Sequence, residues 1–151
     1  NSYKRFVPGY EAPVYVCWPA KTRGPLIRVP PGRGENRRIE LRSPDATPNP
    51  YLALAVLLMA GLDGVENKIM PPESIDENIQ KMSPERRAEL GVEELPRSIK
   101  DAAAELEKDE LILKVLGKEL AHKIIEAQKK EYRAYCMQVT EWEIENYLYK
   151  V

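Results

Sequence analysis

Three charged residues in the stretch RRIELR have the types and spacing to do chemistry: Arg38, Glu40 and Arg42. In an extended strand, side chains alternate between the two faces, so these three share one face. Ile39 and Leu41 then face the opposite way. An amphipathic strand needs a polar face, but it does not need alternating positive and negative charges. The pattern therefore predicts a strand whose polar face meets charged partners.

Arginines recur through the predicted strands, and two carboxylates, Glu11 and Glu40, lie among them. Arginine presents fixed bidentate donors to carboxylate and phosphate oxygens and stays charged in any site. A carboxylate between arginines forms either an ion-pair ladder or part of a divalent-cation site beside bound phosphates. The charge pattern by itself favours the ladder. The arginines concerned are Arg5, Arg23, Arg28, Arg38 and Arg42.

Other kinds of site lack support in the sequence. The single histidine, His122, lies among Lys and Glu in a helical stretch, where a solvated or core-edge role is expected. PPGRGEN resembles a turn and not a phosphate-binding loop, and a pI near 6.0 fits nucleic-acid binding poorly. Cys17 and Cys136 have no metal-ligand spacing, so we expect two reduced thiols.

Charge divides the chain into two parts. Residues 1–45 hold nine Lys and Arg against four Asp and Glu, a net charge of +5, whereas residues 46–151 carry −6. A total of 151 residues with 43% hydrophobic composition is enough for one domain with a core. No apolar run is long enough to cross a bilayer, and no signal peptide is evident. The Arg-rich part is where anions are expected to bind.

The elements that must position these residues are strands followed by helices. APVYVCW, PLIRVP and RRIEL read as strands, with GRGEN as the turn that joins the last two into an antiparallel pair. Asn49 and Pro50 predict the start of a helix over 49–67, apolar nearly all round and therefore buried. The order predicts an α+β fold: a strand-rich segment 1–45, this helix, and a helical region 68–151.

Local signals place further helices in the region 68–151. Ser83 can cap a short helix, and Ser98 can cap a longer one that ends at Gly117. KELAHKIIEAQKKEYRAY predicts a solvated amphipathic helix. EIENYLYKV has Ile144, Tyr147, Leu148 and Val151 at helical spacing, as in a helix that folds onto its own domain.

Long motifs in a fixed order carry a resemblance. NSYKRFVPGYEAPVYV, RGPLIRVP and RRIELRSPDATPNPYLALAVLLMAGLDG, followed by the aromatic tail, resemble the C-terminal part of the catalytic domain of glutamine synthetase, of the prokaryotic type I that forms paired rings. The resemblance spans essentially the whole chain. It implies that the strands belong to the family's catalytic sheet. It also implies a ligase that uses ATP to join ammonium to L-glutamate through γ-glutamyl phosphate, with Mg²⁺ or Mn²⁺ holding the phosphates.

The resemblance also implies a role for each charged residue of the Arg-rich segment. Glu40 matches a metal ligand, and Glu11 matches the flap glutamate that closes the site, contacts the glutamate side and helps take a proton from ammonium. Arg5 and Arg42 match arginines that bind substrate glutamate. Arg23, Arg28 and Arg38 match arginines that contact the ATP phosphates, and Arg23 also matches one that contacts the transferring phosphoryl group. Such work suits arginines and metal ions better than a nucleophile.

Departures from the family pattern limit what this chain is expected to do alone. Gln80 stands where many bacterial members have a tyrosine that is adenylylated, so regulation by other means is expected. The turn PPGRGEN is short, and we assign no ATP contact to Arg33 or Arg37. The family's N-terminal domain, its metal-ligating histidine and most metal carboxylates match nothing here, and the chain does not begin with Met. We therefore expect part of a longer enzyme, inactive by itself.

Two alternatives remain open. One is a γ-glutamyl-amine ligase of the same fold that uses polyamines or ethanolamine. The other is a non-catalytic module for oligomerisation or regulator docking. For the enzyme, the resemblance implies a cytoplasmic homododecamer of two stacked hexameric rings, with the C-terminal tail at the contact between rings. Neither nucleic acid nor membrane is an expected partner.

Overall fold

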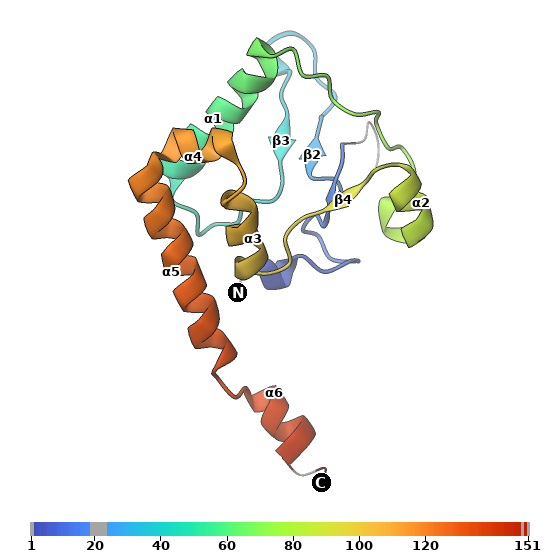
Figure 1. Cartoon of the computed structure of the whole chain (residues 1–151). Helices are drawn as coiled ribbons and strands as arrows, with labels where there is room; N and C mark the ends of the chain where they lie inside the picture. The colour runs from blue at the N-terminus through green and yellow to red at the C-terminus, as the bar shows by residue number, and fades with distance from the viewer. Residues whose placement is uncertain (1, 19–23, 149, 151) are drawn as a thin grey trace. The chain divides into compact units, whose positions relative to one another are not determined.

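The computed structural model describes residues 2–18, 24–148 and 150, and it divides the chain into two units, residues 1–98 and 99–151. Short antiparallel strands and longer helices make up the chain, so the α+β prediction is confirmed (Figure 1). Within the described residues, no helix is both long and apolar enough to cross a membrane. Each unit is considered by itself below.

The first unit contains two two-stranded antiparallel sheets. Strand β2, Ile27–Arg28, pairs with β3, Glu40–Leu41, as the sequence predicts, and the connection includes the 3-10 turn η2, Gly34–Asn36. Strand β1, Tyr15–Val16, pairs instead with β4, Glu93–Glu94, which the sequence does not predict. The chain also forms the 3-10 turn η1, Ser2–Arg5. All four strands are only two residues long, shorter than the predicted segments.

A small apolar core holds the first unit together. Val14, Tyr15 and Cys17 are buried, and Ile79 is only 2% exposed. Ile79 belongs to the 3-10 turn η3, Ile79–Lys81, so a segment distant in sequence packs against β1. Phe6, Ile75 and Val92 are partly buried and pack against this core.

Two of the helix-start signals read from the sequence, those at Asn49 and Ser83, are confirmed. Helix α1, Pro50–Glu66, begins with Pro50, and the Asn49 side chain accepts hydrogen bonds from the backbone of Tyr51 and Leu52. Helix α2, Pro84–Glu89, begins in the same way after Ser83. Both starts combine a side-chain cap with proline at the first helical position.

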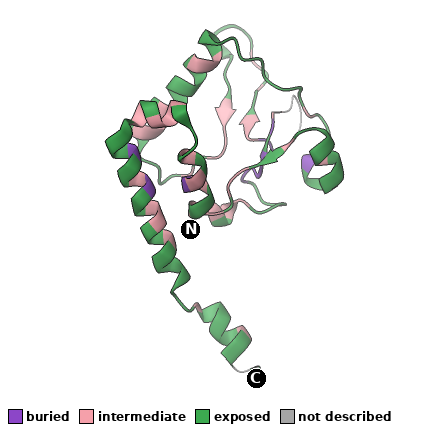
Figure 2. Ribbon diagram, in the orientation of Figure 1, coloured by how far each residue is buried: buried purple, intermediate pink, exposed green. Residues whose placement is uncertain are grey.

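The burial of α1 differs from the prediction. None of its residues is buried (Figure 2). Tyr51, Leu54 and Leu58 are 83%, 66% and 64% exposed. A helix that is apolar on all sides needs a second layer around it. This chain leaves that apolar surface exposed.

The second unit is built from helices. Helices α3, Ile99–Leu106, and α5, Lys118–Cys136, pack through the buried Ala103, Ala121 and Ile125. The single helix predicted to end at Gly117 is instead two helices, because α4, Glu110–Leu116, starts anew with Asp109 as its cap. Gly117 does end α4, with a φ of +77° that glycine adopts without steric cost. The C-terminal α6, Glu141–Glu143, continues into the π-helical η4, Ile144–Leu148.

Candidate active site

The β2–β3 hairpin positions three of the predicted site residues. In its register, Ile27 is opposite Leu41 and Arg28 is opposite Glu40. Directly opposed residues of an antiparallel pair project from the same face, so Arg28 and Glu40 can meet. Arg38 precedes Glu40 by two residues and shares its face. On the other face the expected burial is incomplete, because Leu41 is half-buried while Ile39 is 70% exposed.

Arg28, Arg38 and Glu40 form a cluster, called here the Glu40 cluster. The Nε atom of Arg28 lies 2.7 Å from Oε2 of Glu40, and the Nε atom of Arg38 donates to Oε1 over 3.1 Å. The two arginine side chains are 54% and 57% exposed, and the glutamate side chain is 31% exposed. One carboxylate therefore holds two guanidinium groups at a surface that an anion can reach.

The electrostatics of the Glu40 cluster favour the charged form of its carboxyl group. The hydrogen bond from Arg28 is the largest of the causes that lower the pKa of Glu40, and Arg38 acts in the same direction. Partial desolvation opposes both arginines without reversing the shift. Glu40 is therefore an anion at neutral pH, already engaged at both oxygens.

Arg42 does not join the Glu40 cluster through any contact that the structure records. Its Nη2 donates to the backbone carbonyl of Glu11 over 3.1 Å, and its Nη1 donates to that of Pro25 over 3.3 Å. Arg42 thus connects the end of β3 to the loop that carries Glu11. The Glu11 side chain is exposed beside this connection.

Arg5 lies near a second carboxylate, that of Asp45. Its Nη1 atom donates to the Ser43 carbonyl over 3.4 Å and lies 3.8 Å from Oδ2 of Asp45. Asp45 in turn accepts hydrogen bonds from the backbone and hydroxyl of Thr47, at 2.8 and 2.7 Å. The sequence gives no sign that Arg5 would come near Asp45.

Asp45 is expected to titrate at about pH 2, well below its ordinary pKa of 3.8. The hydrogen bond from Ser2 lowers its pKa most, followed by the two from Thr47 and by the charge of Arg5. Because the folded-state pKa is depressed, the stability that these contacts add is present above pH 3.8 and is lost as the pH falls through about 2. A carbon-13 titration of the Asp45 carboxyl measures this, and a midpoint near 3.8 would contradict it.

Gln80 lies beside two of the candidate loops. Its Nε2 atom is 3.5 Å from the carbonyl oxygen of Tyr10, which precedes Glu11. A Cβ atom added at Gly24 would lie 3.2 Å from the same Nε2, and the φ of +105° at Gly24 also requires glycine. The side-chain amide of Gln80 therefore lies close to the backbone of both loops.

Two predicted roles remain to be placed, that of Arg23 and that of Glu40 as a metal ligand. Arg23 is outside the described residues. Among the described residues, no group of three His, Cys, Asp or Glu side chains could hold a metal ion. Glu40 supplies one carboxylate, whereas Mg²⁺ takes six ligands in near-octahedral geometry. The donor set present does not fit a complete divalent-cation site, and we derive no chemical step through a metal.

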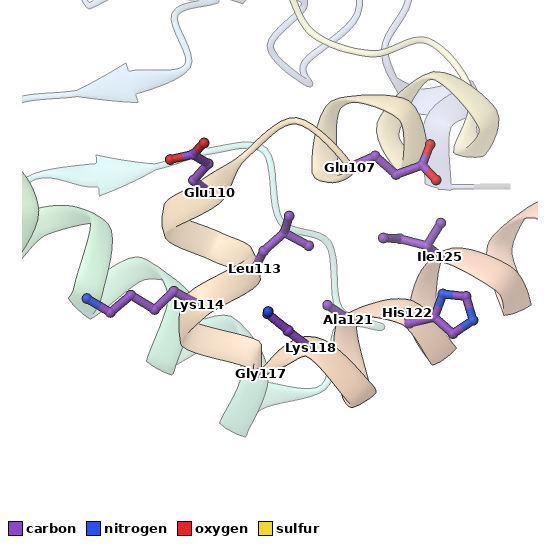
Figure 3. A pocket seen from close by; sticks show the side chains of 9 residues that line it. All are labelled: Glu107, Glu110, Leu113, Lys114, Gly117, Lys118, Ala121, His122 and Ile125. Carbon is purple, nitrogen blue, oxygen red and sulfur yellow. The ribbon is translucent and has the colours of Figure 1, made fainter.

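The second unit contains a hollow between α4 and α5, with a volume of about 570 Å³. His122, exposed on α5, lines it together with Leu113 and Ile125, and charged side chains surround these apolar groups (Figure 3). Glu107 already pairs with Lys129 over 2.5 Å. Among the described residues, no group of three potential metal-binding side chains includes His122.

Comparison with known proteins identifies the family. The family model described as glutamine synthetase, catalytic domain, matches residues 1–147. The chain is 52% identical to the glutamine synthetase of Thermotoga maritima over 149 residues, covering 99% of this chain and 34% of that protein. It is 49% identical to that of Methanocaldococcus jannaschii, covering 98% of this chain and 33% of that protein. The chain spans about one third of the length of these relatives.

Solved structures agree with this result. A chain described as "GmaS/ADP complex-Conformation 1" is similar with a TM-score of 0.77 and 32% identity, covering 91% of this chain and 30% of that one. The cryo-EM structure of Plasmodium falciparum glutamine synthetase gives a TM-score of 0.78 at 24% identity, covering 97% of this chain and 36% of that one. The latter likeness concerns the fold alone. The sequence match along nearly the whole chain shows that it belongs to the glutamine synthetase family.

Proposed function

We propose that this chain is part of an ATP-dependent ligase that joins ammonium to the γ-carboxylate of L-glutamate through γ-glutamyl phosphate. The observation that carries the proposal is the identity of 52% to a glutamine synthetase over essentially the whole chain. The Glu40 cluster supports it, because two arginines beside one carboxylate suit the binding of phosphate groups. Since the chain spans a third of its relatives, we propose that catalysis requires a longer protein.

Within that protein, we assign the arginines to the two substrates. Arg28 and Arg38 would contact the ATP phosphates, together with Arg23, which would also contact the transferring phosphoryl group. Phosphoryl transfer needs positioning and stabilisation of charge, which fixed guanidinium groups supply. The ADP named in the description of one structural relative is in keeping with a nucleotide site in this fold.

Arg5 and Arg42 are assigned to substrate glutamate, and Glu11 to the flap. The contact from Arg42 to the Glu11 carbonyl supports a link between glutamate binding and the loop that carries Glu11. An exposed Glu11 carboxylate can approach a bound ammonium ion and accept a proton from it. Closing the loop would exclude water while an acyl phosphate exists.

Glu40 is assigned as one ligand of a divalent cation, Mg²⁺ or Mn²⁺. The remaining ligands would come from parts of the longer protein. When bound, the cation would neutralise charge on the phosphates. This chain contributes the carboxylate and the arginines around it.

Assembly into two stacked hexameric rings in the cytoplasm completes the proposal. Trp142, Tyr147 and Leu148 near the C-terminus are each more than 60% exposed, which supports a tail that buries them against another subunit. The apolar surface of α1 would likewise be covered by the rest of the enzyme.

The test of this function is phosphate release from ATP by the full-length gene product, with glutamate present and different amine acceptors compared. Release that depends on ammonium supports the proposed ligase. Release that requires ethanolamine or a polyamine would replace it with a γ-glutamyl-amine ligase. A discrete oligomer that releases no phosphate with any acceptor would instead favour a non-catalytic module.

A further inference from the structure

Both oxygens of Glu40 are occupied by arginines that the proposed function assigns to ATP phosphates. We propose that Glu40 is an internal competitor of phosphate, which holds Arg28 and Arg38 until a polyphosphate chain displaces it. The inference rests on the proposed function, because that function assigns Arg28 and Arg38 to the ATP phosphates. It follows from the contacts within the hairpin.

The hairpin geometry makes Glu40 a bridge between the two arginines. Arg28 reaches it from β2, directly across the strand pair, and Arg38 reaches it along the same face of the chain. Each arginine contacts a different carboxylate oxygen. Two like charges so placed would repel each other without an anion between them, and Glu40 provides that anion from within the chain.

A phosphate chain that binds these arginines must exchange with the Glu40 carboxylate. Exposed ion pairs stabilise a protein only weakly. Breaking two of them should therefore weaken polyphosphate binding by about fivefold. An anion with several charges can replace both contacts at once, whereas a small monoanion such as chloride replaces one. Glu40 thus favours triphosphates over small anions at this site.

Removing the glutamate charge would also reduce simple repulsion of phosphate, so the test must separate the two effects. Glu40→Asp keeps the charge but shortens the side chain by one methylene, which weakens both arginine contacts. Glu40→Gln removes the charge and the contacts together. Glu35→Gln is the matched control, because Glu35 lies in the turn of the same hairpin and forms no ion pair with another described residue.

The experiment is calorimetric titration of the full-length gene product with inorganic triphosphate in EDTA, with folding of each variant checked by circular dichroism. We expect Glu40→Asp and Glu40→Gln to bind triphosphate about fivefold more tightly than wild type. Glu35→Gln should change the affinity by less than about twofold. A Glu40→Asp variant that binds like wild type overturns the proposal, whatever the Gln variant does.

The acceptor assay separates this inference from the proposed function. If the wild type shows ammonium-dependent phosphate release but the Glu40 variants bind triphosphate as the wild type does, the ligase function is supported and Glu40 is not a competitor of phosphate. If both Glu40 variants bind triphosphate more tightly but the wild-type protein releases no phosphate, Glu40 competes with phosphate and the proposed ligase function is wrong.

Discussion

Arg28→Gln in the full-length gene product is expected to lower kcat/KM for ATP by about a hundredfold or more. Arg28 faces Glu40 across the hairpin and is assigned to the ATP phosphates. Loss of one preorganised donor to a developing negative charge typically costs 10²–10³ in rate. Steady-state ammonium-dependent phosphate release, measured across ATP concentrations, gives this ratio.

Arg33→Gln is the matched control for this prediction. The substitution removes the same charge from the same hairpin, but Arg33 precedes the turn η2 and has no assigned contact with ATP. We expect its kcat/KM to stay within about threefold of wild type, as for a screened surface charge. Equal losses in the two variants would show that general positive charge, and not the position of Arg28, supports the reaction.

Ile79→Ala is expected to lower the stability of the first unit by about 3 kcal/mol. Ile79 is 2% exposed and packs with Val14, Tyr15 and Cys17. Truncating a buried isoleucine removes apolar contact and leaves a cavity, which costs about 2–5 kcal/mol. Native-state hydrogen exchange at the Leu95 amide, which donates to the Val14 carbonyl over 2.8 Å, reports the opening of this core.

The control for this loss of stability is Ile69→Ala. Ile69 is 62% exposed and lies beyond the end of α1, so the same truncation should change the opening free energy by less than about 0.5 kcal/mol. If both variants exchange alike at Leu95, then Ile79 is not part of the core that holds β1 and β4 together.

Local signals made several elements predictable. The caps at Asn49 and Ser83 depend on residues next to each helix start, and both were read from the sequence. The antiparallel pairing of β2 with β3 was also predicted, because the turn between them has a compact, glycine-rich sequence. Each of these features is decided within a short stretch of chain.

Features that depend on distant partners were not predictable in the same way. The pairing of β1 with β4 joins residues far apart in sequence, and Glu93 and Glu94 have low strand propensity. The exposure of α1 depends on which layers surround it, which its own sequence does not specify. The break before α4 had a local signal, since Asp109 is a good N-cap, but continuous apolar spacing hid it.

In the candidate site, too, contacts decided by neighbouring residues were predictable and contacts with distant segments were not. Alternation along RRIELR was enough to predict that Arg38 and Glu40 share a face. The register that brings Arg28 opposite Glu40 depends on hairpin length, and the sequence alone left it open. The contact of Arg42 with the Glu11 carbonyl involves backbone from a distant loop, for which no sequence pattern exists.

The most direct test of the central claim is ammonium-dependent phosphate release from ATP and glutamate by the full-length gene product, wild type against Glu40→Ala, with Glu35→Ala as the control. We expect the wild type and the control to be active and the activity of Glu40→Ala to be lower by about a hundredfold or more. Full activity in Glu40→Ala would contradict it, and would make the Glu40 cluster an ion-pair ladder with no part in catalysis.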